Sequence, residues 1–262
     1  DLSMARKLFD QMPDRNVVTW TTVINGYMQV GRVQVAERLF REMPSRDTAA
    51  WNCMIYGYCR NGKVDEAFRV FEQMPSRDVI SWTSMISGLD QNGRSEDAIR
   101  LFQDMVGYGI EPTTSTFSCL ISACAKALAV DLGAQIHSRI VKLGLVLDEF
   151  VASSLITFYA NCQQLESSLE VFNEKAHASV VVWTSLLTGY SSNLNHDGAL
   201  EVFCEMIRRG YFPNESSFTS ALNSCCAVLS LDTGKMIHAE AVKLGFEASA
   251  FVGSSLITFY SK

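Results

Sequence analysis

The sequence predicts an all-α protein, a right-handed α-solenoid (superhelix) of stacked helix-turn-helix repeats, and three observations lead to this prediction. MPDRN at 12–16, MPSRD at 43–47 and MPSRD at 74–78 recur at a constant interval. SSLITFY occurs at 153–159 and again at 254–260, over a longer interval. The segments between these blocks carry apolar residues at helical spacing. Self-similarity at fixed periods is the signature of repeat architectures.

The two intervals have a common origin in repeats of 31 and 35 residues. Three consecutive repeats of 35, 35 and 31 residues span the interval between the two copies of SSLITFY. The predicted repeats are 17–47, 48–78, 79–113, 114–148, 149–179, 180–214 and 215–249. Residues 1–16 resemble the end of a preceding repeat, and 250–262 the first helix of a further one. We therefore expect a tract of a longer array, because a two-helix repeat buries its apolar face only against neighbours.

Each repeat is predicted to form two helices joined by a turn. In repeat 17–47 the first helix has an apolar face spaced i, i+3, i+4 and i+7, formed by Trp20, Val23, Ile24 and Tyr27. The second helix ends before Pro44, which cannot continue it. Gly31 stands where a left-handed residue would close the first helix. Gln163 and Leu194 take this place in later repeats, which predicts that those two turns are looser or have a different shape.

Composition excludes several classes of protein. A hydrophobic content of 48% indicates a folded chain, and no apolar run is long enough to span a bilayer. None of the eight cysteines forms a C-x-x-C pair, so we expect packing residues and neither a zinc site nor a disulfide framework. His238 and Glu240 spell H-x-E, but no C-x-x-C follows, and His137 shows that the histidine belongs to the repeat. No catalytic residue, metal or cofactor is predicted.

The sequence resembles the pentatricopeptide repeat (PPR) family, in its plant P-L-S subclass of the RNA-editing-factor type. VVTWTTVINGYMQVGRVQVAERLFREMPSRD at 17–47, ACAKALAVDLGAQIHSRIVKLG at 123–144 and the 35-35-31 order carry the resemblance. It classes 79–113 and 180–214 as P repeats and 114–148 and 215–249 as L repeats. The short, or S, repeats are then 17–47, 48–78 and 149–179, and 250–262 begins another.

The resemblance implies sequence-specific binding of single-stranded RNA, about one base per repeat. In the family, the fifth and last residues of a repeat recognise the base, and we call them the recognition pair. The implied pairs are Thr21 with Asp47, Asn52 with Asp78, Thr83 with Thr113, Ser118 with Asp148, Ser153 with Ser179, Thr184 with Asn214 and Thr219 with Ser249, and Ser254 is the fifth residue of the incomplete repeat. The first two pairs imply G and U, Thr184 with Asn214 implies A, and two others favour a purine. The implied target is 5′-G-U-(purine)-N-(purine)-A-N-3′.

Two further sets of residues follow from the same resemblance. The second residue of a repeat packs against the base faces, and these residues are Val18, Ala49, Ile80, Phe150 and Val181. Serines replace it in the two L repeats, where weaker recognition is expected. Arg60 and Lys126 stand where the family places a phosphate contact. Because basic residues are few and the net charge is −6, we expect modest, salt-sensitive binding.

The resemblance implies a factor that specifies C-to-U editing sites in transcripts of mitochondria or chloroplasts. A transit peptide is expected outside this sequence. Editing accessory proteins and a C-terminal deaminase domain, in the same chain or another, are the implied partners, and no membrane is. One alternative is a factor for splicing or stabilising organellar RNA. Another is a protein-binding helical scaffold, which the negative charge favours.

Overall fold

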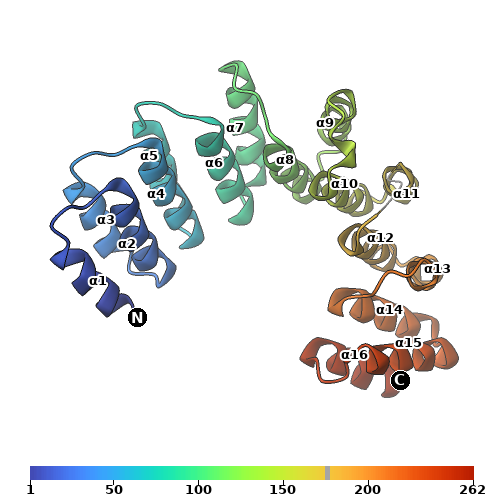
Figure 1. The fold of residues 1–262 in the computed structure, drawn as a ribbon. Helices are drawn as coiled ribbons and strands as arrows, with labels where there is room; N and C mark the ends of the chain where they lie inside the picture. The colour runs from blue at the N-terminus through green and yellow to red at the C-terminus, as the bar shows by residue number, and fades with distance from the viewer. Residues whose placement is uncertain (175–177) are drawn as a thin grey trace. The chain divides into compact units, whose positions relative to one another are not determined.

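The computed structural model describes residues 1–174 and 178–262, and its regular elements are helices (Figure 1). It divides into two compact parts, Asp1–Ala123 and Cys124–Lys262, and the boundary falls within one helix, α8. The N-terminal part contains α1 (Leu2–Gln11), α2 (Val17–Gln29), α3 (Val33–Glu42), α4 (Thr48–Arg60), α5 (Val64–Gln73), α6 (Val79–Gln91), α7 (Ser95–Gly107) and the start of α8 (Thr114–Ala127). The C-terminal part continues with α9 (Val130–Lys142), η1 (Leu145–Leu147), α10 (Glu149–Asn161), α11 (Leu165–Asn173), α12 (Val180–Ser192), α13 (His196–Arg208), α14 (Glu215–Val228), α15 (Leu231–Lys243) and α16 (Ala250–Tyr260).

Within each part the helices stack in the same way. In the N-terminal part α4 packs between α2 and α6, and each of these three helices also packs on the helix that follows it. In the C-terminal part α12 lies against α10 and α14, and α14 lies against α16. The first helices of successive repeats are therefore neighbours, so equivalent side chains recur along one face. The assignment of repeats to the S, P and L classes stays a prediction.

The MPSRD block closes one repeat and opens the next. Arg46 donates from Nε to the carbonyl of Phe40 at 2.8 Å and from a terminal nitrogen to the carbonyl of Arg41 at 2.7 Å. Its guanidinium also lies 5.0 Å from the centre of the Phe40 ring. These carbonyls end α3 and lack partners within the helix. Asp47 then caps α4 by accepting a hydrogen bond from the Ala50 N–H. At all three places where the motif occurs, its arginine bonds the end of one helix and its last residue caps the next.

Aromatic pairs link successive repeats. Trp51 meets Phe40 edge to face with ring centres 5.1 Å apart, and the equivalent pairs are Phe9–Trp20, Phe71–Trp82 and Phe172–Trp183. In each pair the tryptophan lies on a first helix and the phenylalanine on the second helix of the preceding repeat. The tryptophans thus belong to the packing between repeats.

The turns at Gln163 and Leu194 have the same shape as the glycine turns, so the prediction of a different shape is wrong. Gln163 and Leu194 both have φ of 60°, and Gly31 has φ of 75°. The hydrogen bonds also match: the N–H after the turn residue reaches back to Tyr159 and Tyr190, just as that of Arg32 reaches Tyr27. Packing of the two flanking helices fixes the turn, and the side chains tolerate a left-handed conformation that glycine adopts freely.

In the part of the chain that the structure describes, no helix combines the length and apolarity needed to cross a membrane. The same residues contain no group of three or more His, Cys, Asp or Glu side chains that could hold a metal ion.

Candidate functional site

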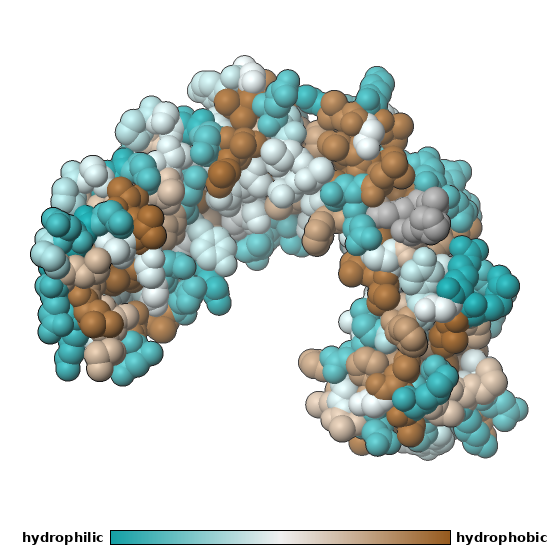
Figure 2. Space-filling model, in the orientation of Figure 1, coloured by the Kyte–Doolittle hydropathy of each residue, from teal (hydrophilic) through white to brown (hydrophobic). Residues whose placement is uncertain are grey.

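The second residues of the repeats form a series of exposed apolar side chains on the first helices. Val18 is 68% exposed, Ile80 59%, Phe150 75% and Val181 53%, and Ala49 is also exposed. Phe251, which the sequence reasoning left out, continues the series at 71%. Its place as the second residue of 250–262 is the signal that could have found it. Figure 2 shows apolar residues lying at the surface among polar ones, as such positions require.

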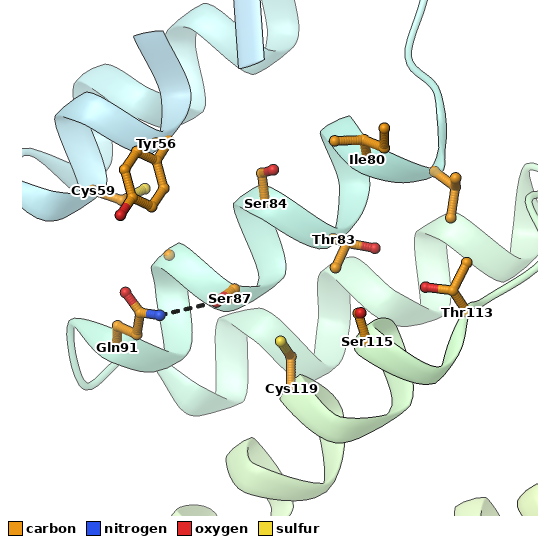
Figure 3. A pocket seen from close by; sticks show the side chains of 12 residues that line it. Tyr56, Cys59, Ile80, Thr83, Ser84, Ser87, Gln91, Thr113, Ser115 and Cys119 are labelled. Carbon is orange, nitrogen blue, oxygen red and sulfur yellow. Dashed lines mark hydrogen bonds between the residues drawn. The ribbon is translucent and has the colours of Figure 1, made fainter. Parts of the chain in front are cut away.

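One cavity, of about 410 Å³, lies beside the second and fifth residues of repeat 79–113 (Figure 3). Ile80 and Thr83 on α6 line it together with Thr113, so three of the predicted site residues meet there. Ser115 and Tyr56 line it as well. The cavity joins an exposed apolar side chain to two hydroxyl groups, a lining suited to a flat, polar-edged ligand.

The two hydroxyl groups of this recognition pair are joined through a third. Thr116 is fully buried, and its Oγ1 lies 2.7 Å from Thr83 Oγ1 and 3.1 Å from Thr113 Oγ1. The Thr113 N–H also donates to Thr116 Oγ1 at 3.1 Å. Sequence reasoning missed Thr116 because the third residue of a repeat has no role in the family pattern that it applied.

A second cavity, of about 630 Å³, lies in the C-terminal part and likewise places an exposed apolar side chain beside a recognition pair. Its lining includes Val181, Thr184 and Asn214 of the predicted site, and also Thr219 and Phe251. Ser217, the equivalent of Thr116, is buried and lies 2.8 Å from Thr184 Oγ1. It donates to Asn214 Oδ1 from its N–H at 2.9 Å, and its hydroxyl reaches the same oxygen at 3.0 Å.

Asn52 and Asp78, the predicted pair for U, bond to each other. Burial favours a higher pKa for the Asp78 carboxyl, but hydrogen bonds from the Ser81 N–H and hydroxyl and from the Asn52 side chain hold the pKa below its ordinary value. Because a carboxylate only accepts, the Asn52 amide must turn its Nδ2 toward Asp78. Asn52 Oδ1 is then left buried, and among the described residues it has no partner.

Several last residues also cap the helix that follows. Asp47, Asp78, Asp148 and Asn214 each accept hydrogen bonds through one side-chain oxygen, Oδ1. Capping uses part of the hydrogen-bonding capacity of these side chains, and the second carboxylate oxygen or the amide nitrogen can still face a ligand.

In the other repeats no side-chain hydrogen bond among the described residues joins the two members of the recognition pair. Thr21 bonds the carbonyls of its own helix, as do Ser153 and Ser254. Ser118 lies in the N-terminal part and Asp148 in the C-terminal part. The hydroxyl groups of Ser118 and Ser179 are buried and have no partner among the described residues.

Both members of the recognition pair of repeat 215–249, a predicted L repeat, bond to one residue, Glu215. Thr219 donates to its carbonyl at 2.9 Å, and Ser249 donates to its carboxylate at 2.6 Å. Both hydroxyl protons are thereby used within the protein, which accords with the weak recognition expected of an L repeat.

The two predicted phosphate contacts, Arg60 and Lys126, lie in the last turns of α4 and α8, and both are exposed. Burial raises the pKa of Cys59, which lines the first cavity, to about 11, and it raises the pKa of Cys53 to the same value, so neither thiol is activated. These cysteines therefore behave as packing residues.

Comparison with protein-family models gives matches to PPR repeats along the chain. The model described as "PPR repeat family" matches residues 15–49, 77–126 and 178–227, and that described as "PPR repeat" matches 45–75. A mitochondrial pentatricopeptide repeat-containing protein of Arabidopsis thaliana is 53% identical over 152 residues, 58% of this chain and 22% of that protein. A chloroplastic one from the same plant is 30% identical over 263 aligned residues, 100% of this chain and 32% of its own length. The chain thus spans less than a third of the length of these relatives.

Solved structures show the same fold. The crystal structure of the pentatricopeptide repeat protein PPR10 from maize superposes with a TM-score of 0.70 at 17% identity, over 98% of this chain and 39% of that one. The crystal structure of PPR10 in complex with an 18-nt psaJ RNA element gives a TM-score of 0.65 at 20% identity, over 99% and 37%. The predicted fold class, an all-helical solenoid of stacked repeats, is confirmed.

Proposed function

The chain belongs to the PPR repeat family, and from this premise we propose that it binds single-stranded RNA and recognises about one base with each repeat. The family is non-catalytic, so the repeats act by binding. The solved complex of PPR10 with an RNA element supports the proposal. The proposed target is 5′-G-U-(purine)-N-(purine)-A-N-3′, with G at repeat 17–47, U at 48–78 and A at 180–214.

One observation carries the proposal: the cavities gather the side chains that recognition of a base requires. In each cavity an exposed apolar side chain, Ile80 or Val181, stands beside a polar recognition pair. An apolar side chain can cover the face of a base, and the polar pair can bond its Watson–Crick edge. We assign Val18, Ala49, Phe150 and Phe251 the same role as Ile80 and Val181.

Charge limits how strongly the repeats hold RNA. The chain carries 22 basic and 28 acidic residues, and only Arg60 and Lys126 occupy the proposed phosphate-contacting position. Phosphate contacts supply the salt-dependent part of affinity, while base contacts supply sequence preference. Binding is therefore modest in strength, and its selectivity comes from the cavities.

We also propose the finer assignment: a P-L-S factor that specifies C-to-U editing sites in organellar transcripts. Relatives named mitochondrial and chloroplastic support the location. The alternating repeat lengths of 31 and 35 support the subclass. A protein-binding scaffold is the second candidate, and the net charge of −6 favours it.

Titration with short RNAs tests the proposal. The chain is titrated with an RNA carrying G, U and A at the assigned places and with permutations of the same bases. The matched RNA should bind at least about tenfold tighter, because each lost base contact costs on the order of 1 kcal/mol. Affinity should fall as salt rises. Equal affinity for all RNAs contradicts base recognition, and tight binding to peptides in place of RNA favours the scaffold.

A further inference from the structure

At two junctions between repeats, the third residue of one repeat has a buried hydroxyl group that contacts both members of the recognition pair of the repeat before it. Thr116 bridges Thr83 and Thr113, and Ser217 bridges Thr184 and Asn214. We propose that Thr116 and Ser217 are positioning residues: each engages both members of the pair, so that one member offers a proton to a base and the other offers a lone pair. This inference rests on the proposed function.

At Thr116, counting donors and acceptors leaves two possible arrangements of the hydrogen bonds. A hydroxyl has one proton and two lone pairs, and Thr116 is buried away from water. One lone pair accepts the Thr113 N–H at 3.1 Å. The proton and the other lone pair remain for the hydroxyls of Thr83 and Thr113. One of these two threonines must therefore donate inward and face the cavity as an acceptor, and the other keeps its proton for a ligand.

The order of donor and acceptor in this pair can reverse. If Thr83 donates to Thr116, then Thr116 donates to Thr113, and Thr113 is the donor toward the cavity. If all three hydroxyls rotate, the roles of Thr83 and Thr113 exchange at no loss of hydrogen bonds. Repeat 79–113 thus offers one donor and one acceptor in either order.

At Ser217 the order is fixed. Asn214 Oδ1 is engaged by the N–H and hydroxyl of Ser217, so the Nδ2 group, a donor, is left for a ligand. Thr184 lies 2.7 Å from the Val180 carbonyl and 2.8 Å from Ser217 Oγ. If Ser217 donates to Asn214, Thr184 must donate to Ser217; otherwise Thr184 donates to the Val180 carbonyl. In both cases the Thr184 proton stays in the protein, and Thr184 faces the cavity as an acceptor.

This difference predicts different selectivity. Adenine and cytosine place an amino donor beside a ring-nitrogen acceptor, whereas guanine and uracil place a carbonyl acceptor beside a ring N–H donor. If the base is held in one orientation, a pair with a fixed donor and a fixed acceptor distinguishes amino bases from keto bases. A pair whose donor and acceptor can exchange does not distinguish them. Repeat 180–214 should prefer amino bases over keto bases, and repeat 79–113 should accept both.

Repeat 149–179 shows what is missing without the third hydroxyl. The third residue of the next repeat is Val182, which is buried and has no hydroxyl group. The Ser179 hydroxyl is buried and has no partner among the described residues. No described residue therefore directs the hydroxyl proton of Ser179. A hydroxyl at the third place is thus what connects the two members of the pair at repeats 79–113 and 180–214.

The test measures base preference in RNAs that differ only at the base assigned to repeat 180–214. Wild-type protein should bind A over G there by about tenfold, the value of one well-made hydrogen bond. Ser217→Ala should lower this ratio by at least about threefold, because Thr184 and Asn214 Oδ1 each lose one of the two partners that hold their orientation. Ser217→Thr should restore it. At the base assigned to repeat 79–113, wild-type protein should bind A and G within about threefold of each other.

Ser224→Ala is the matched control, because Ser224 is an equally buried serine of α14 whose hydroxyl bonds Ser191 and Ser220. It should leave the ratio of A to G affinity unchanged. An unchanged ratio in Ser217→Ala, or an equal fall in Ser224→Ala, overturns the inference while base recognition stands. Strong discrimination of A from G at repeat 79–113 also overturns it. A wild-type protein that shows no preference at any base refutes the proposed function, and the inference with it.

Discussion

Single arginines have a larger structural role than their surface position suggests. Arg77 repeats the geometry of Arg46: Nε donates to the Phe71 carbonyl at 2.8 Å, and a terminal nitrogen donates to the Glu72 carbonyl at 2.8 Å. The guanidinium stacks 4.8 Å from the centre of the Phe71 ring. A planar group with several donors can satisfy two carbonyls and an aromatic face together, which a lysine ammonium cannot.

Arg77→Lys should therefore lower the free energy of unfolding by about 1–2 kcal/mol, although the charge is kept. Urea unfolding followed by circular dichroism measures the change. Arg69→Lys, at an exposed arginine of the same repeat, is the control and should stay within about 0.5 kcal/mol of wild type. A loss no larger than that of the control would refute the capping role of Arg77.

At the scale of helices, close approach of backbone to an aromatic ring determines where glycine is needed. A Cβ added at Gly234 in α15 would lie 2.0 Å from the Phe259 ring of α16, and one at Gly133 in α9 would lie 2.0 Å from the Phe158 ring of α10. These are equivalent places in repeats 114–148 and 215–249. The second helix of the repeat therefore rests on the next first helix through a glycine.

Gly234→Ala should destabilise the protein by about 1–3 kcal/mol, since the Phe259 ring must move within a packed core. Thermal unfolding measures the effect. Gly253→Ala in α16 is the control, because the nearest atom to the added Cβ would be 3.9 Å away. Alanine there should stabilise by up to about 1 kcal/mol through helix propensity. Equal effects of the two substitutions would show that α15 and α16 do not pack in this way.

For the whole molecule, repetition in the sequence was enough to predict the stacked helices. Helical spacing of apolar residues and recurring blocks such as MPSRD gave the helices because the same local interactions form each junction. The turns at Gln163 and Leu194 were predicted wrongly, since residue type suggested strain that the packed helices overcome. The bridging hydroxyls of Thr116 and Ser217 could not be predicted, because they depend on contacts between repeats about 33 residues apart in sequence.

The central claim, that the fifth and last residues of a repeat recognise one base, is tested most directly at repeat 48–78. Binding is measured for wild-type protein and Asn52→Thr with RNAs carrying U or G at the assigned base. The substitution gives this repeat the recognition pair of repeat 17–47, threonine with aspartate. Wild-type protein should prefer U and the variant should prefer G, each by about tenfold, the effect of about 1.4 kcal/mol. An Asn52→Thr protein that binds RNA with the wild-type preference for U would contradict the account.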